Sequence, residues 1–333
     1  MSWAGGPWLS HWELPHPSGI CYDAGRRRLY VSSTRWPNQV FEFLAIDRES
    51  PPSELFGSEV PPLDDRTLLA PVRSWFLPGS LDIHEVAMLD GNVVFTATGH
   101  NFLAQLLNDG GWKRLWWPRA LDGLEARVGR RPFDQRYFQL NGVAVGGGLD
   151  QFLFTAFSDE TTGPKPWKAG YGPRQKGVVF SGGTREVVAR GFTCPHSVRW
   201  RDGIPWVCDS GYGTVGYLRG SEYTPVLTVP GFTRGLAFHG GYGFVGLSKV
   251  IPKYEAYAPG IVADDSACGV VAFEAATGKE VGRLVWPEGY QVFDVQLLAG
   301  IAKPFLPPPS DQQEDNKAFL MHYGYDRDAR PKG

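Results

Sequence analysis

The chain has few cysteines, and none of the paired spacings that build disulfide frameworks or zinc knuckles. Reduced, buried thiols are typical of the cytoplasm, so we expect that location and no disulfides. No run of about 18 apolar residues could span a membrane, and the first residues lack the basic and apolar regions of a signal peptide. The cysteines stand singly, mostly within apolar segments, at Cys21, Cys194, Cys208 and Cys268.

The chain also lacks a surplus of charge of either sign. Lys and Arg number 33 against 35 Asp and Glu, a formal net charge of −2 at pH 7. We therefore expect a small-molecule substrate, with neither nucleic acid nor a membrane as partner, and leave the oligomeric state open. The sequence holds no phosphate-binding loop, no dinucleotide-binding fingerprint and no nucleophile-elbow serine, which argues against the enzyme classes built on them.

Glycine, proline and aromatic residues are abundant instead. The chain has 42 Gly and 27 Pro, 14% of its residues are aromatic, and only 20% are charged. A helical protein would carry more Ala, Leu, Glu and Lys, so this composition favours an all-β fold. All-β folds of this length commonly form one domain, and we expect a single domain over residues 1–333.

Six short segments resemble one another, each with a polar residue just before a run of apolar ones. A repeat at this coarse period predicts a six-bladed β-propeller, in which the innermost strands start at the axis and bring their first residues together. We expect ring closure by pairing of residues 318–323 with residues 8–14, and a disordered tail at about 327–333. The six lead residues are Ser18, His84, Asn141, His196, Arg234 and, more loosely, Asp294.

Two long loops enlarge the repeat, at about 158–176 and 249–267. Both fall between the expected second and third strands of a blade, on the face where the innermost strands begin. Long ordered loops on a rigid scaffold commonly carry function. We expect them to act as substrate lids through Trp167, Tyr171, Arg174, Tyr254 and Tyr257.

Three histidines fall at or near lead positions: His16, His84 and His196. Imidazoles from separate blades could hold a divalent ion, with zinc, iron, manganese or copper favoured over calcium. Asn141 and Asp294 are further candidate ligands, or partners that fix a histidine tautomer. The alternative is that the histidines are hydrogen-bonded residues that fill a polar channel.

Other polar residues near the same face are candidates for catalysis. Arg234 would orient an anionic group of the substrate; otherwise it forms a structural ion pair with Asp294 or Glu85. The candidates for moving a proton are His100, Asp209 and Tyr212.

Several segments together resemble an uncharacterised bacterial β-propeller family, described as a domain of unknown function. The resemblance covers roughly residues 8–300 and implies the fold and the choice of positions, but no activity. The segments are Leu81–Glu85, Gln139–Val143, Pro195–Ser197, Pro230–Phe238 and Val292–Gln296.

The arrangement of lead residues is also similar, more distantly, to that of two kinds of six-bladed propeller enzyme. Sugar lactonases of this type place an acidic residue, an Asn and an Asp around calcium; Asn141 matches that Asn, but Ser18 stands where the acid is expected. The lyase of the amidating enzyme uses three histidines on zinc with an Arg near the substrate. That resemblance implies metal ligation by the three histidines, with Arg234 at the substrate.

These observations predict a metal-dependent enzyme, a lyase, cyclase or hydrolase. It would act on a small polar, anionic molecule at the top mouth of the propeller channel. Two alternatives stay open: a non-catalytic module that binds a ligand or peptide, and a calcium-dependent hydrolase like the sugar lactonases.

Overall fold

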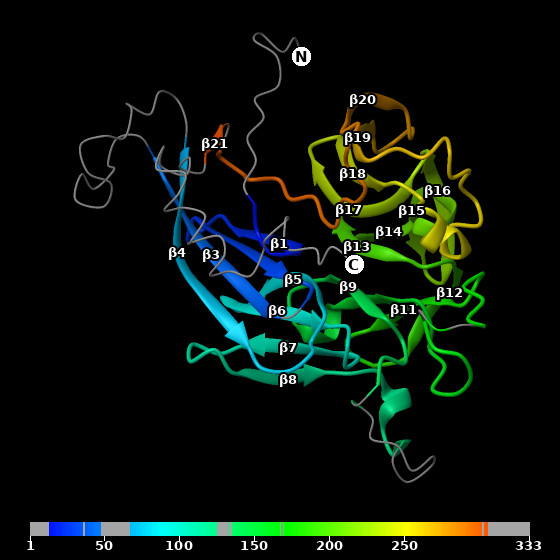
Figure 1. Cartoon of the computed structure of the whole chain (residues 1–333), viewed down its shortest axis with the longest axis horizontal. Helices are drawn as coiled ribbons and strands as arrows, with labels where there is room; N and C mark the ends of the chain where they lie inside the picture. Colours follow the sequence, from blue (N-terminus) through cyan, green and yellow to red (C-terminus); the bar gives the residue numbers. More distant parts are fainter. Residues whose placement is uncertain are drawn as a thin grey trace, which may run out of the picture.

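The chain is a β-propeller with five blades over the residues that the structure describes. The computed structural model describes residues 13–35, 37–47, 67–124, 133, 135–166, 168, 170–301 and 303–305. In these residues the strands form five sheets, which surround a common centre in Figure 1. The prediction of an all-β propeller is confirmed, and the prediction of six blades was wrong.

The first two blades use the N-terminal part of the chain, coloured blue to cyan in Figure 1. In both, each strand pairs antiparallel with the next, from the centre outward. Blade 1 is β1 (Pro17–Asp23), β2 (Arg28–Ser33), β3 (Asn38–Ile46) and β4 (Thr67–Leu77), and blade 2 is β5 (Ile83–Leu89), β6 (Asn92–Ala97), β7 (Phe102–Leu106) and β8 (Trp112–Trp116).

The other three blades follow in chain order with the same antiparallel pattern. Blade 3 is β9 (Leu140–Ala144), β10 (Leu153–Ala156), β11 (Gly177–Ser181) and β12 (Val187–Phe192). Blade 4 is β13 (His196–Arg201), β14 (Ile204–Asp209), β15 (Thr214–Arg219) and β16 (Glu222–Thr228). Blade 5 is β17 (Phe232–His239), β18 (Tyr242–Ser248), β19 (Gly269–Glu274) and β20 (Glu280–Val285).

The first five sequence repeats are the innermost strands of these blades. Tight turns explain why the repeats are regular, because Asp90–Gly91 and Asp202–Gly203 have positive φ at both residues (48° and 73°, 50° and 74°). Turns of this kind match the twist of a hairpin and favour Asp-Gly. The turns therefore fold each lead strand back onto its neighbour.

The sixth repeat, beginning at Asp294, forms no strand. Its backbone runs between blades 5 and 1: the Ile20 N–H donates to Asp294 Oδ2 at 3.2 Å, and a Cβ on Gly235 would lie 2.5 Å from the Asp294 carbonyl carbon. The segment occupies the place of an innermost strand. A blade needs further strands beside it, and the only one among the described residues that follow, β21 (Pro304–Phe305), pairs parallel with β4 instead. The predicted closing pair and the tail fall outside the described residues, apart from Glu13 and Leu14, which lie in no strand.

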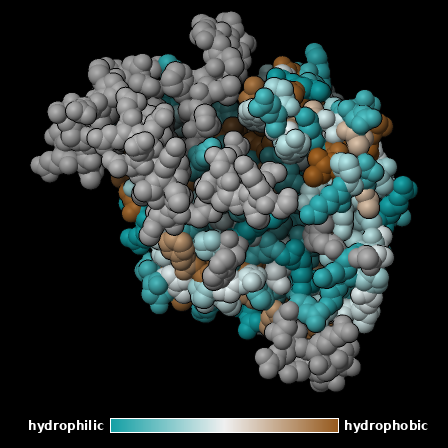
Figure 2. All heavy atoms as spheres, in the orientation of Figure 1, coloured by the Kyte–Doolittle hydropathy of each residue, from teal (hydrophilic) through white to brown (hydrophobic). Residues whose placement is uncertain are grey.

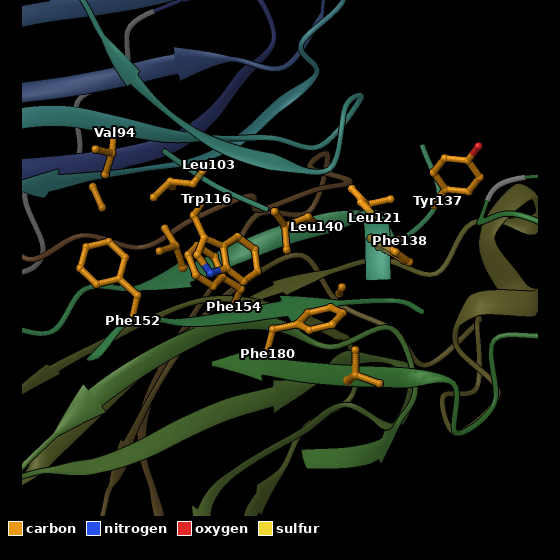
Figure 3. Close-up of a cluster of buried hydrophobic side chains, with 14 of the residues drawn as sticks. Val94, Leu103, Trp116, Leu121, Tyr137, Phe138, Leu140, Phe152, Phe154 and Phe180 are labelled. Carbon is orange, nitrogen blue, oxygen red and sulfur yellow. The ribbon is translucent and has the colours of Figure 1, made fainter. Parts of the chain in front are cut away.

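Apolar side chains between neighbouring blades form the core. The largest cluster joins blades 2 and 3 (Figure 3), where Trp116 of β8 stacks on Phe154 of β10 with 3.8 Å between ring centroids. The Trp116 Nε1–H donates to the Gly182 carbonyl at 2.9 Å, so the buried indole keeps its hydrogen bond. Within the described residues, no helix is long and apolar enough to cross a bilayer.

Candidate functional site

The lead residues share a local backbone design. In every blade the register between the first two strands shifts near the lead position, which is the mark of a β-bulge. Bulges re-aim side chains and are common beside active sites. In four blades a non-glycine residue with positive φ also precedes the lead residue by two positions: His16 (42°), Asp82 (56°), Gln139 (54°) and Cys194 (54°).

A cavity of about 710 Å³ opens at the lead ends of the strands. In Figure 2, hydrophilic residues (teal) are visible near the middle of the face shown. Blades 1, 2, 3 and 5, the loop after β18 and the segment before Asp294 all contribute. Its wall is formed by Thr34, Arg35, Asn38, Ser80, Asp82, His84, Arg136, Gln139, Phe232, Arg234, Ser248, Lys249, Val250, Lys253, Tyr254, Tyr257, Ala258, Gln291 and Phe293.

Positive charge dominates this wall. Asp82 is the one carboxylate among the described lining residues, and it is already ion-paired with Arg136. The other side chains that carry a full positive charge are Arg35, Arg234, Lys249 and Lys253. A cavity with low-dielectric walls and one sign of charge attracts ligands of the opposite sign.

A second, smaller cavity lies at the centre of the propeller. Its volume is about 10 Å³, and it shares three lining residues with the larger cavity: His84, Arg234 and Phe293. The two cavities are therefore neighbours separated by these side chains. The other residues around the smaller cavity are Glu85, Asn141, His196, Ser197 and Asp294.

Two of the predicted histidines border the small cavity in the same tautomer. His84 Nδ1 lies 3.0 Å from the Asp82 carbonyl, and His196 Nδ1 lies 2.9 Å from the Cys194 carbonyl. A carbonyl only accepts, so each Nδ1 carries the proton and each Nε2 presents a lone pair. Gln139 Nε2 donates to His84 Nε2 at 3.3 Å, whereas His196 Nε2 has no hydrogen-bond partner.

Burial keeps both imidazoles neutral. Burial, with the charge of Arg234, lowers the pKa of His84 to about 3. Burial, with the charges of Arg234 and His84, holds the pKa of His196 well below its usual value. At neutral pH both histidines are therefore hydrogen-bond acceptors.

Arg234 borders both cavities and is only 6% exposed. Its guanidinium lies over Phe293 and Phe232, 4.8 and 5.4 Å from the ring centroids. No described carboxylate pairs with it, and its Nε has no hydrogen-bond partner. Burial lowers the pKa of Arg234 to about 10, so it stays charged at neutral pH.

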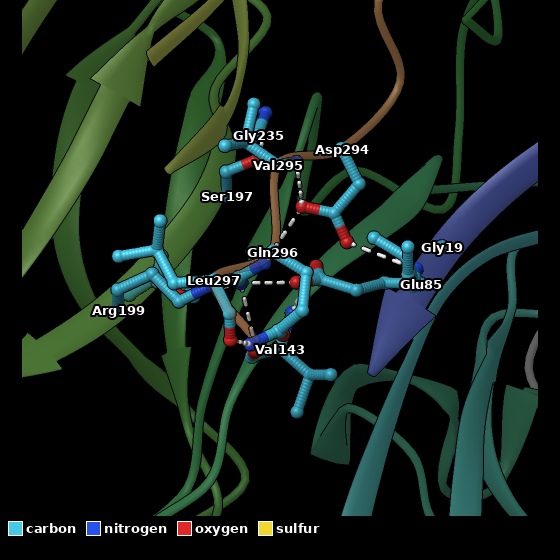
Figure 4. Close-up of polar contacts among 12 residues, drawn as sticks. Gly19, Glu85, Val143, Ser197, Arg199, Gly235, Asp294, Val295, Gln296 and Leu297 are labelled. Atoms are coloured by element: carbon cyan, nitrogen blue, oxygen red, sulfur yellow. Dashed lines mark hydrogen bonds and ion pairs between the residues drawn. The ribbon is translucent and has the colours of Figure 1, made fainter. Parts of the chain in front are cut away.

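The buried carboxylates near the centre pair with a different arginine, Arg199, which the sequence reasoning missed. Figure 4 shows Arg199 contacting both Glu85 and Asp294, with 3.1 Å between its Nη2 and Asp294 Oδ1. The Val143 N–H also donates to Glu85 Oε2 at 2.8 Å. The suggested ion pair of Arg234 with these acids is therefore not formed.

Four of the predicted metal and catalytic residues line neither cavity. His16 lies outside both, with its pKa lowered by burial and by Arg35. His100 holds a loop, with Nδ1 2.5 Å from the Phe133 carbonyl. Asp209 accepts from the Thr193 N–H at 2.6 Å, and burial raises its pKa to about 7. Tyr212 packs against Gly260.

The two predicted lids differ in their relation to the larger cavity. The loop after β18 contains the 3₁₀ helix η4 (Pro252–Tyr257), from which Tyr254 and Tyr257 line the cavity. In the loop after β10, Tyr171 is buried and donates to the Phe157 carbonyl at 2.6 Å, and Arg174 is exposed. Trp167 lies outside the described residues.

The donor set around the small cavity gives little support for a divalent ion. Among the described residues, no group of three or more His, Cys, Asp or Glu side chains is placed to hold a metal. His84 and His196 each offer a lone pair there, but His16 is elsewhere and the Arg234 cation borders the same space. The metal site stays a prediction.

Sequence comparison identifies the family. Residues 6–306 match the family described as a domain of unknown function, DUF4915, and the chain belongs to it. The resemblance stated from the sequence is thus confirmed at the level of the family; a bacterial origin stays a prediction. No relative is found among the curated proteins.

Solved structures share the fold at low sequence identity. A luciferin-regenerating enzyme is 13% identical, with 82% of this chain and 77% of that chain covered and a TM-score of 0.50. A gluconolactonase from Xanthomonas campestris is 15% identical, with 84% and 78% covered and a TM-score of 0.50. At this identity the likeness establishes a propeller and nothing of the chemistry.

Proposed function

We propose that this chain is an enzyme that acts on a small organic anion bound in the larger cavity. The observation that carries the proposal is Arg234, a buried arginine at the boundary of both cavities that has no carboxylate partner among the described residues. A buried charge is costly unless it is paired. A ligand carboxylate or phosphate would supply the missing counter-charge.

The rest of the wall supports an organic anion. Arg35, Lys249 and Lys253 add positive charge. Phe232, Phe293 and two tyrosines add apolar surface, which would cover the carbon skeleton of a ligand. A bare inorganic ion would leave that surface unused.

The two neutral histidines favour an enzyme over a simple binding module. The His196 Nε2 lone pair has no described partner, whereas that of His84 accepts from Gln139, so a proton acceptor and a group that stabilises negative charge lie together at His196 and Arg234. This pairing suits a lyase, a cyclase or a hydrolase. A non-catalytic module would need the arginine but not the lone pairs.

Binding calorimetry tests the anion site directly. Succinate, citrate and inorganic phosphate would be titrated at low salt into the wild type, Arg234→Met and Arg219→Met, the last an exposed arginine outside both cavities. We expect Arg234→Met to weaken binding about 10- to 100-fold, the loss of one charge-assisted contact, and Arg219→Met to bind like the wild type. Wild type that binds none of the three, or equal binding by Arg234→Met, would refute the proposal.

A further inference from the structure

Three buried polar atoms around the small cavity have no hydrogen-bond partner. They are Asn141 Nδ2, His196 Nε2 and Arg234 Nε, from blades 3, 4 and 5. All three residues are less than 7% exposed. Unpartnered buried groups are rare, because each loses its hydrogen bonds to water on folding. Three of them around one space indicate a site for a ligand.

The size and chemistry of the space select that ligand. A volume of about 10 Å³ matches one water-sized probe. Asn141 Nδ2 and Arg234 Nε donate, and His196 Nε2 accepts; the Thr155 hydroxyl already donates to Asn141 Oδ1 at 2.8 Å. A halide ion would leave His196 without a donor, and a metal ion would face the Arg234 cation. Water accepts two hydrogen bonds and donates one, so it satisfies all three atoms.

We propose that the small cavity holds one water molecule, bound by Asn141, His196 and Arg234, and that this water is the nucleophile of a hydrolytic reaction. The inference rests on the proposed anion site and narrows its reaction to hydrolysis. The substrate class is a small carboxylate-bearing ester or lactone.

The shared position of Arg234 brings the two reactants together. Its side chain borders both cavities, so a substrate bound to this guanidinium and the water contact the same residue. The Arg234 Nε–H releases the water, and the freed lone pair of the water oxygen bonds to the carbonyl carbon while His196 Nε2 takes a water proton and the C=O electron pair moves onto the carbonyl oxygen. The carbon–oxygen ester bond then breaks, and His196 returns the proton to the departing oxygen. One water is consumed, and an acid and an alcohol are released.

The neutral state of His196 fits this role. Burial and the charge of Arg234 hold its pKa well below the usual value, so its lone pair is available at neutral pH. A bound anion offsets the charge of Arg234 and raises the pKa of His196 toward its ordinary range. Proton acceptance is therefore easiest when substrate is present.

Diffraction tests the water itself. We expect a crystal structure of the full chain at atomic resolution to show one spherical peak within hydrogen-bond distance of the three atoms, without anomalous signal. No peak, or a peak with the anomalous signal of a metal, would overturn the proposal.

Hydrolysis of mono(4-nitrophenyl) succinate, an ester that carries a carboxylate, tests the reaction. His196→Gln lacks the imidazole, and His239→Gln, at the exposed last residue of β17, is the matched control. We expect His196→Gln to lose about 10²- to 10⁴-fold in kcat, the range for general-base catalysis. It should still bind succinate within about twofold of the wild type, which also shows that it is folded, because no new charge is placed at the site. His239→Gln should match the wild type.

The outcomes separate the two proposals. If the wild type binds succinate but does not cleave the ester, or if His196→Gln cleaves it equally fast, the nucleophilic water is wrong and the anion site stands. If the wild type binds none of the calorimetry anions, the anion site fails, and the water proposal fails with it.

Discussion

Replacing Arg199 by methionine should destabilise the fold strongly, because it leaves two buried carboxylates without their counter-charge. The side chains of Glu85 and Asp294 are only 6% and 3% exposed, and that of Arg199 is 22% exposed. Removing one partner from a buried ion pair costs about 3–5 kcal/mol. Asp294 also accepts a hydrogen bond from the Ile20 N–H. We therefore expect the loss of Arg199 to weaken the packing of the segment between blades 5 and 1 as well.

Arg283 provides the matched control for this variant. It pairs with Glu280 at 2.6 Å, but both side chains are about one-third exposed. Exposed pairs contribute about 0–1 kcal/mol, so we expect Arg283→Met to change the free energy of unfolding by no more than that. Urea unfolding followed by tryptophan fluorescence would measure both variants.

The pH dependence of Arg199→Met adds a second check. Burial raises the pKa of Glu85 and Asp294, and the charge of Arg199 opposes that rise. Without the arginine, the folded-state pKa values rise further above those of the unfolded chain. A raised carboxylate pKa costs stability as pH rises, so the deficit relative to the wild type should be larger at pH 8 than at pH 4. A loss below about 1 kcal/mol, or one equal at both pH values, would refute the reasoning.

Three further substitutions test the buried charges one at a time. Without added anion, Arg234→Met should raise the free energy of unfolding by about 3 kcal/mol, because a pKa lowered from 12.5 to about 10 reflects that cost; a less stable variant would show that the arginine already has a partner. The pKa of His84 is about 3 in the folded chain against 6.5 in the unfolded chain, so His84 lowers the free energy of unfolding of the wild type by about 1.4 kcal/mol per pH unit as pH falls between these values. His84→Gln should reduce the slope of stability against pH by that amount, with the contribution of His196 left in place. The pKa of Asp209 is about 7 in the folded chain against 3.8 in the unfolded chain, so Asp209 lowers the free energy of unfolding as pH rises between these values. The stability of Asp209→Asn relative to the wild type should therefore increase with pH up to pH 8. A stability difference that does not change with pH would show that Asp209 is ionised throughout.

The lead strands could be predicted because their signals are local. A polar residue before an apolar run, followed by a glycine-containing turn, marks the first strand in each of the five blades. The number of blades depends on long-range pairing instead. Asp294 begins a segment that takes the place of an innermost strand without strand partners, and its match to the other five repeats is looser.

Arg199 was missed because a bulge changes which residues share a face. Strict alternation from His196 puts Val198, not Arg199, on the same side. In the structure His196 pairs with Cys208 and Arg199 with Trp206, which are two residues apart on β14. The extra residue in β13 therefore brings Arg199 to the side of His196. The bulge is marked by the positive φ of Ser197, 51°, and the sequence does not show this backbone angle.

Propeller geometry predicted that His84, His196 and Arg234 approach one centre. It did not predict the positive charge of the cavity wall around them. Lys249 and Lys253 belong to the loop after β18, whose path no repeat specifies. Arg136 enters the wall from the segment before β9 and pairs with Asp82. Loop residues of this kind can be assigned to a cavity only from a structure.

Anomalous diffraction from crystals soaked in sodium bromide tests the central claim, the anion site at Arg234, without knowledge of the substrate. The account predicts a bromide peak against the Arg234 guanidinium on the side of the larger cavity, lost in Arg234→Met. A structure with no bromide at Arg234, and with a transition-metal peak between His84 and His196, would contradict it.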